Sequence, residues 1–451
     1  MEESPEIVKN IQKKPSRRKF IFTIVIIYLC FLSVYIYMGV IWKLKPDPAS
    51  EKMIRQIVSE QLNKEPNELT DEDFLNFTEF DTIVKLKAGP FRRPNLELSD
   101  IRFLKKIKNL QVLNLERISF SEKNIPRWIK ILADHGFIDL KEIFFIDLKP
   151  LKNLVNLKEL NLYNSHVNNI KTLANLTNLE RLGLGGTFVS DIEPIKKLTN
   201  LINLNLYKTP IPDLEPLKGL LNLQTLEVHY TSVSDLEPIK DLTKLRHLIL
   251  DSTQVSNLEP IRELTNLQRL QIDETLVSDL EPLRELTNLQ ILHINNTNVS
   301  NLEPIKGMAN LQSLQINKTL VSDLEPLKDM INLQTLNISN TNVSNLEALS
   351  GLTNLQRLFV GDTTVANLEP IKGLINLQVL NLRNTQVSDL ELIKELKNLQ
   401  RFDISGTLVS EIKPLKELKN LRVLSMRNCI NITDEQVEDL QKALPNLEIG
   451  R

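Results

Sequence analysis

One pattern of hydrophobic and polar residues recurs with a fixed spacing through most of the chain. A single copy, residues 265–286, reads TNLQRLQIDETLVSDLEPLREL. Its Asn-Leu pair returns every 22 residues from Asn156 to Asn420, and only Lys244 interrupts the asparagine column. A fixed period of this length is typical of a solenoid, in which each unit packs against its two neighbours.

Each unit predicts a short strand, a turn and a short helical segment. The alternation in Leu270-Gln-Ile272 has the period of a strand with one buried face. The Ser-Asp or Ser-Asn pair that follows indicates a turn, and the later Glu-Pro suits the start of a helical or 3₁₀ turn. Because one unit cannot enclose its own leucines, we expect the strands to stack as a parallel sheet about 4.8 Å apart.

The L-x-x-L-x-L pattern with its 22-residue period resembles the leucine-rich repeat family, over roughly residues 80–451. The short regular unit is most similar to the bacterial internalin-type class. This resemblance implies an α/β repeat solenoid, shaped as a horseshoe or rod, with a parallel β-sheet on its concave face and helical caps at its ends.

Two polar columns accompany the leucines. Where the family usually places an asparagine two residues before the valine column, this chain has Ser165 and then threonines from Thr187 to Thr407. We expect each hydroxyl to bond one backbone group near the strand end. We expect the asparagine column that includes Asn178 to bond turn backbone, so both columns are interpreted as structural.

The N-terminus departs from this composition. Residues 1–19 form a basic, polar tail, and residues 20–42 are free of charge. A helix over residues 20–42 would be about 34 Å long, enough for a bilayer core of about 30 Å. A cleaved secretory signal is the alternative, but no small-residue cleavage motif follows. We therefore expect an uncleaved transmembrane signal anchor in a bacterial inner (cytoplasmic) membrane, with a cytoplasmic N-terminus and an extracytoplasmic repeat domain.

The remaining chain divides by pattern. Residues 43–50 are a proline-containing linker, and residues 51–81 predict two helices that resemble the N-terminal cap of bacterial leucine-rich repeats. The first has an apolar face from Met53 to Leu62, and the second begins at Thr70.

Two further segments flank the regular repeats of residues 156–427. Residues 82–155 are irregular repeats with a predicted helix over 121–134, which contains Trp128, and a predicted strand over 137–146. Residues 428–451 form a predicted C-terminal cap, in which a capping box at Thr433 opens a helix that ends before Pro445. Cys429 is expected to be buried there.

Composition and motifs argue against several functions. The formal net charge is −2, which is unlike a dedicated nucleic-acid binder. No zinc-protease, nucleophile-elbow or P-loop motif occurs, so we expect neither an enzyme nor a cofactor. Gly183, Gly185 and Gly186 lie along a repeat strand, which disfavours a phosphate site. A glutamate column beginning at Glu193 and a basic column three residues later predict a self-neutralised outer face.

The variable positions carry the functional hypothesis. Residues that flank or separate the two core leucines of each strand should face the concave side. Tyrosine, histidine and arginine there are residue types that anchor interfaces, although isolated exposed aromatics are also ordinary. The candidate partner-binding residues are Tyr163, Tyr207, His229, Tyr230, His247, Arg269, His293, Arg357 and Phe359, and Arg383 and Arg401 lie on the same face. The three histidines occupy different columns or repeats, so no metal site is expected.

The sequence therefore favours a membrane-anchored module that binds a protein or a cell-envelope polymer through its concave face. A structural spacer or adhesin-like stalk is one alternative. A regulatory scaffold for an enzyme is another, by resemblance to the phosphatase-binding leucine-rich proteins. That family is cytosolic, so the predicted anchor counts against it.

Overall fold

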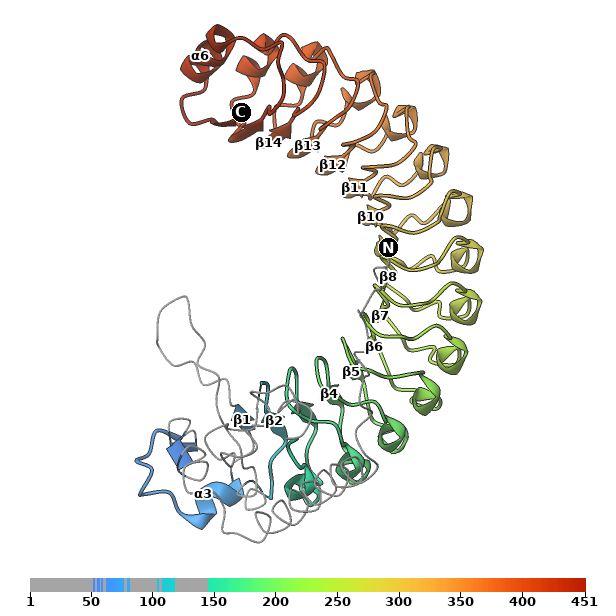
Figure 1. The fold of residues 1–451 in the computed structure, drawn as a ribbon, viewed down its shortest axis with the longest axis vertical. Helices are drawn as coiled ribbons and strands as arrows, with labels where there is room; N and C mark the ends of the chain where they lie inside the picture. Colours follow the sequence, from blue (N-terminus) through green and yellow to red (C-terminus); the bar gives the residue numbers. More distant parts are fainter. Residues whose placement is uncertain are drawn as a thin grey trace, which may run out of the picture.

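The computed structural model describes residues 52, 55–56, 58–59, 62–76, 79–81, 104, 108–117 and 145–451. Its strands form one parallel sheet of 16 strands, in which neighbours in sequence are neighbours in the sheet. The sheet lines the inner, concave side of an open horseshoe, and the 3₁₀ segments lie on the outer side (Figure 1). The predicted repeat solenoid is confirmed.

The strands have three residues each. They are β1 Glu79–Asp81, β2 Val112–Asn114, β3 Glu159–Asn161, β4 Arg181–Gly183, β5 Asn203–Asn205, β6 Thr225–Glu227, β7 His247–Ile249, β8 Arg269–Gln271, β9 Ile291–His293, β10 Ser313–Gln315, β11 Thr335–Asn337, β12 Arg357–Phe359, β13 Val379–Asn381, β14 Arg401–Asp403, β15 Val423–Ser425 and β16 Glu448–Gly450.

The outer side carries 3₁₀ segments, and α-helices lie in the end regions. The 3₁₀ segments are η3 Lys149–Leu151, η4 Lys171–Asn175, η5 Glu193–Lys197, η6 Glu215–Leu217, η7 Glu237–Ile239, η8 Glu259–Ile261, η9 Glu281–Leu283, η10 Glu303–Ile305, η11 Glu325–Leu327, η12 Glu347–Leu349, η13 Glu369–Ile371, η14 Glu391–Glu395 and η15 Lys413–Glu417. Among the described residues, α3 spans Asp71–Asn76 and α6 spans Asp434–Ala443, and residues 52, 55–56, 58–59 and 62 are also helical.

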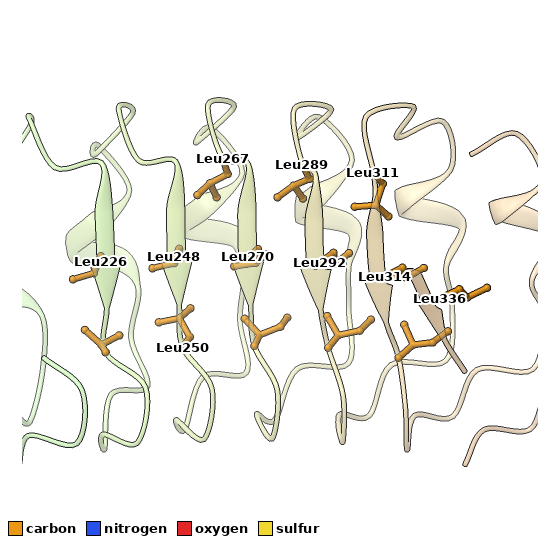
Figure 2. Close-up of a cluster of buried hydrophobic side chains, with 14 of the residues drawn as sticks. Leu226, Leu248, Leu250, Leu267, Leu270, Leu289, Leu292, Leu311, Leu314 and Leu336 are labelled. Carbon is orange, nitrogen blue, oxygen red and sulfur yellow. The ribbon is translucent and has the colours of Figure 1, made fainter. Parts of the chain in front are cut away.

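The core is built from columns of buried leucine, isoleucine and valine side chains. Leu270 pairs in register with Leu292, and Leu292 with Leu314, so equivalent side chains lie directly above one another (Figure 2). All three are 0% exposed. Each strand therefore buries its central residue and turns the residues on either side toward the concave surface.

The two polar columns behave as predicted. The Thr275 hydroxyl donates to the carbonyl of Ile272 at 2.7 Å, which closes the turn within a unit. The Asn288 amide donates to the carbonyl of Thr265 at 2.9 Å, in the preceding unit. The threonines therefore stabilise single repeats, while the asparagines tie neighbouring repeats together.

The outer face is self-neutralised, as expected. In η9, Arg284 forms a two-fold hydrogen-bonded pair with Glu281, at 2.7 and 2.8 Å. The aspartate of the Ser-Asp turn has a defined role, because Asp279 accepts the backbone N–H of Glu281 at 2.8 Å. This acceptor satisfies the first free donor of the 3₁₀ turn.

The structure describes only part of the irregular region. In that part, β2 pairs directly with β3 in register Val112↔Glu159. Ile146 lies outside any strand, and its N–H donates to the carbonyl of His166 at 2.7 Å. Residues 137–144 of the predicted strand lie outside the described residues, so the structure tests only its last two residues, which are not in a strand. The predicted helix with Trp128 lies outside the described residues.

The N-terminal cap is partly as predicted. Thr70 and Asp73 cap α3 reciprocally, with the Asp73 N–H donating to the Thr70 hydroxyl at 3.2 Å and the Thr70 N–H to the Asp73 carboxylate at 2.8 Å. Val58 is buried, but Leu62 is 36% exposed rather than on the same buried face. Residues 79–81 form β1, the first strand of the sheet, and are not helical as the cap prediction implied.

The C-terminal cap contains the predicted helix and one unpredicted strand. The Thr433 hydroxyl accepts the Gln436 N–H at 3.3 Å and so caps α6. The Gln436 side chain donates to the carbonyl of Ser410 at 3.0 Å instead of returning to Thr433, so only half of the capping box forms. Cys429 is buried, and its thiol donates to the carbonyl of Ile404 at 3.1 Å. β16 pairs with β15 beyond the helix.

None of the helices in these described ranges is long and apolar enough to cross a membrane. Residues 1–19, 20–42 and 43–50, on which the predictions of a basic tail, a transmembrane anchor and a linker fall, lie outside those ranges.

Candidate binding surface on the concave face

Four of the candidate residues meet on one part of the concave face. The rings of Tyr163 and Tyr207 stack with centroids 5.9 Å apart and an interplanar angle of 13°. Tyr207 contacts His229 at 4.5 Å and meets Tyr230 edge-on at 5.7 Å. Tyr230 is 56% exposed. We call Tyr163, Tyr207, His229 and Tyr230 the aromatic cluster.

A glycine makes this stacking possible. Tyr163 and Tyr207 occupy the same position in repeats two units apart, and Gly185 holds that position in the repeat between them. A Cβ atom at Gly185 would lie 2.9 Å from two ring carbons of Tyr163 and 2.5 Å from Oδ1 of Asn205. Gly185, two residues beyond the end of β4, therefore provides the room in which the two rings meet, which is a packing role that the sequence alone did not suggest.

Replacing Gly185 with Ala should disrupt the stack, because the new methyl group must displace the Tyr163 ring. Near-ultraviolet circular dichroism reports ordered tyrosines, so we expect a weaker tyrosine signal with little change in secondary structure. Gly351→Ala is the matched control, since its nearest heavy atom would lie 4.0 Å away. An unchanged tyrosine signal in Gly185→Ala would contradict the proposed spacing role.

The aromatic cluster has an uncharged histidine, His229, and a neighbouring carboxylate, Glu227. Burial lowers the pKa of His229, and its buried Nδ1 atom has no hydrogen-bond partner among the described residues. The neighbouring Glu227 accepts from the Asn205 amide at 2.6 Å, and burial raises its pKa. His229 therefore presents a neutral ring beside a partly desolvated carboxylate at neutral pH.

A line of polar side chains continues from the cluster along the same column. Asp251 accepts the backbone N–H of Asp273 at 2.9 Å, Asp273 accepts that of Asn295 at 2.6 Å, and Asn295 accepts that of Asn317 at 2.9 Å. Burial raises the pKa of Asp251 to about 6 and also raises the pKa of Asp273. Sequence reasoning missed these two carboxylates, although they lie in the same 22-residue column as Tyr207 and His229.

The other candidates are spread along the horseshoe and do not join the aromatic cluster. His247 begins β7, Arg269 begins β8 and His293 ends β9. Arg269 and His293 are linked through Gln271, which accepts from Arg269 at 3.0 Å and contacts His293 Nδ1 at 2.8 Å. Arg357 and Phe359 lie farther along, in β12.

Another aromatic contact lies outside the strands and was not predicted. Phe188 stacks on His166 at 5.4 Å with an interplanar angle of 4°, and meets Phe145 edge-on at 5.6 Å. Phe188 is 42% exposed. The described residues contain no group of three or more histidine, cysteine or carboxylate side chains that could hold a metal ion.

Comparisons with known proteins agree with this architecture. A family model described as Leucine Rich repeats (2 copies) matches residues 177–219, 331–373 and 375–417. No curated protein sequence matches the chain.

Solved structures share the fold over most of the chain. An internalin (inlF) of Listeria monocytogenes is 25% identical, with a TM-score of 0.61, and the match covers 84% of this chain and 97% of that one. A leucine-rich repeat protein of Leptospira interrogans is 21% identical, with a TM-score of 0.70 and the same coverages of 84% and 97%.

A more distant match is the ectodomain of the Arabidopsis thaliana receptor kinase GASSHO1/SCHENGEN3, solved in complex with CASPARIAN STRIP INTEGRITY FACTOR 2. It is 18% identical, with a TM-score of 0.59, and the match covers 82% of this chain and 49% of that one. Taken with the sheet and its 22-residue register, the matches identify the repeats of this chain as leucine-rich repeats, arranged in an internalin-like solenoid.

Proposed function

We propose that this protein is a binding module that holds a protein partner against its concave face, with the aromatic cluster as the anchor. The observation that carries the proposal is the contact of four rings from three repeats across β3–β6. Leucine-rich repeats commonly serve as protein-interaction modules, and the plant ectodomain of the same fold was solved with a second named factor bound. Neither fact names the partner of this chain.

The arrangement suits interface energetics. Tyrosines bury a large area with few rotatable bonds, so ordering them on binding costs little conformational entropy. Here the rings already hold one another in place, which lowers that cost further. The repeat backbone beneath them is a continuous hydrogen-bonded sheet, so we expect the partner to meet a surface that changes little on binding.

We propose further that residues 20–42 anchor the chain in a bacterial inner membrane and leave the repeats on the extracytoplasmic side. The proposal rests on the uncharged stretch and the basic residues before it. It predicts that a single cysteine placed in the linker of residues 43–50, with Cys30 and Cys429 replaced, is labelled by a membrane-impermeant thiol reagent in intact cells. Labelling only after lysis would place the repeats in the cytoplasm.

A site-specific photocrosslinker tests the binding surface directly. With p-benzoylphenylalanine at Tyr230 in the full-length protein, we expect one discrete crosslinked protein in native cells, identified by mass spectrometry. Adding Tyr207→Ala should reduce that product at least about tenfold, because truncated hot-spot residues cost about 2 kcal/mol or more.

Two controls make the result interpretable. Phe188→Ala removes an exposed aromatic outside the strands and should leave the Tyr230 crosslink unchanged. The same crosslinker at Lys372, on the outer face, should give no such product. A Tyr230 crosslink that survives Tyr207→Ala, or that appears equally from Lys372, would contradict the proposal. A crosslink to polysaccharide alone would replace the protein partner with an envelope polymer.

A further inference from the structure

The C-terminal part of the concave face presents a set of exposed arginines on neighbouring strands. Arg357 begins β12 and Arg401 begins β14, while Arg383 and Arg427 lie two residues beyond the ends of β13 and β15. All four are exposed. We call Arg357 with Arg401 the first row and Arg383 with Arg427 the second row.

These arginines differ from the basic residues of the outer face in the same repeats. There the cations are lysines, and Lys372 and Lys394 each pair with a glutamate three residues earlier. None of the four arginines forms an ion pair with any described residue. A cation without an intramolecular partner keeps its full hydrogen-bonding capacity for a ligand, and the guanidinium fork is suited to paired contacts with a carboxylate.

The two rows are staggered. Val379 separates Arg357 from Arg401 in the first position of the strands, and Ser405 separates Arg383 from Arg427 beyond the strand ends. Arginines in one row are therefore two strands, or about 10 Å, apart. At that distance like charges repel only weakly in water, so the surface can keep these charges unpaired.

A central column of residues runs between the rows. It consists of the third residue of each strand, namely Phe359, Asn381, Asp403 and Ser425. The carboxylates of this region are in local hydrogen bonds or at its edge. Asp403 accepts the Ser405 N–H at 2.9 Å, Asp362 accepts from the Asn384 amide at 2.7 Å, and Glu448 begins β16. With Arg422 also exposed beside β15, five arginines face three carboxylates, and the excess charge is positive.

We propose that an extended acidic segment of a protein partner lies along this central column, across β12–β15, and places its carboxylates against the two arginine rows. Side chains of an extended segment alternate between its two sides, and those on one side are about 6.8 Å apart. Arginine side chains are long and flexible enough to reach carboxylates at this spacing, although the arginines of one row are about 10 Å apart. Phe359 gives the segment one apolar contact at the start of the column.

This inference rests on the proposed function, because it describes the same partner, but it uses different residues. The aromatic cluster lies on β3–β6 and the arginine rows on β12–β15, at separate parts of the horseshoe (Figure 1). A substitution can therefore remove the contact at the aromatic cluster and leave the contact at the arginine rows intact, or the reverse.

A fluorescein-labelled poly-L-glutamate peptide tests the arginine rows by fluorescence anisotropy with the full-length protein in detergent. We expect the triple variant Arg357→Gln, Arg383→Gln and Arg401→Gln to bind at least about tenfold more weakly than the wild type, because each loses a charge-assisted contact. The control Lys328→Gln, Lys372→Gln and Lys394→Gln makes the same change in net charge on the outer face and should bind as the wild type does.

Further variants distinguish the paired hydrogen bonds of the guanidinium group from charge attraction alone. Replacing the same three arginines with lysine keeps the charge and should still weaken binding several-fold, since an ammonium group cannot make the paired contact. Tyr207→Ala should leave peptide binding unchanged. The peptide assay therefore tests the arginine rows alone, and the Tyr230 crosslink tests the aromatic cluster. Equal losses in the arginine and lysine-control variants, or full binding by the arginine-to-lysine variant, would overturn the inference. Tighter, arginine-dependent binding of polyadenylate RNA would make the occupant a nucleic acid.

Discussion

Replacing Leu292 with Ala should destabilise the solenoid by about 3–5 kcal/mol, the largest effect expected of any single substitution discussed here. Leu292 is 0% exposed and lies between Leu270 and Leu314 in the stacked column (Figure 2). Removing its side chain leaves a cavity bordered by two neighbouring strands that are held in fixed register. Such a site cannot collapse without breaking the ladder, so the cost should be near the upper part of the range.

The damage should also be local. Each repeat contacts chiefly its neighbours, so the stability of a solenoid is close to a sum of repeat and interface contributions. Hydrogen exchange should therefore show lost protection in β8–β10 before any loss in β3–β5. Leu276→Ala is the matched control, because this leucine is 54% exposed and its truncation should change the free energy of unfolding by no more than about 0.5 kcal/mol. Similar losses for both variants would contradict the assignment of Leu292 to the core.

The repeat itself could be predicted from sequence because every unit repeats the same local preferences. The leucine spacing recurs in every unit, and the Ser-Asp or Ser-Asn turn and the Glu-Pro segment recur in most of them, so a departure in a single unit does not change the prediction. The asparagine and threonine columns could be predicted for the same reason, and the hydrogen bonds of Asn288 and Thr275 confirm them.

The ends were harder because nothing repeats there. β1 and β16 are three-residue strands whose sequences, EFD and EIG, carry almost no period. They form because the sheet offers an unpaired edge, which is a tertiary cause that propensity does not contain. The half-formed capping box at Thr433 has a similar origin, since Gln436 reaches the carbonyl of Ser410 in a neighbouring repeat.

The candidate surface was predictable as a list of residues but not as a grouping. Alternation places Tyr207 and His293 on the same face, yet only the structure shows that Tyr207 meets Tyr163 across Gly185. The burial of Asp251 was also invisible, because the sequence shows a charged residue in a variable position and says nothing of the neighbours that exclude water. Grouping and desolvation both depend on side chains from other repeats.

Replacing Asp251 with Asn should stabilise the protein at neutral pH. Burial raises the pKa of the Asp251 carboxyl to about 6, so at pH 7 folding holds a partly desolvated charge. Raising the pKa of this carboxyl from 3.8 to about 6 corresponds to about 3 kcal/mol at most, and solvent screening at this partly buried site should reduce the gain to about 1–2 kcal/mol. Asparagine keeps the acceptor, as Asn295 shows by accepting the Asn317 N–H at 2.9 Å.

The advantage of Asp251→Asn should vanish as the pH falls. The pKa of Asp251 in the folded protein, about 6, lies above the ordinary aspartate value of 3.8, so folding takes up a proton at pH values between the two. The wild-type protein therefore gains stability from this site as the pH falls through 6, and the gain is complete below 3.8. Melting curves of the wild type and the variant should differ most near pH 7.5 and converge toward about pH 4.5.

Comparing the two proteins at each pH isolates this carboxyl from the others, which matters because Asp273 and Glu227 also have raised pKa values. Asp279→Asn is the control, because Asp279 caps an exposed 3₁₀ turn. In the next repeat the equivalent residue is Asn301, which already accepts the Glu303 N–H at 2.9 Å. The difference in melting temperature between Asp279→Asn and the wild type should therefore be the same at every pH. If Asp251→Asn were less stable than the wild type at pH 7.5, the ionised carboxylate would be stabilising, and the concave face at β7 would be more hydrated than its burial indicates.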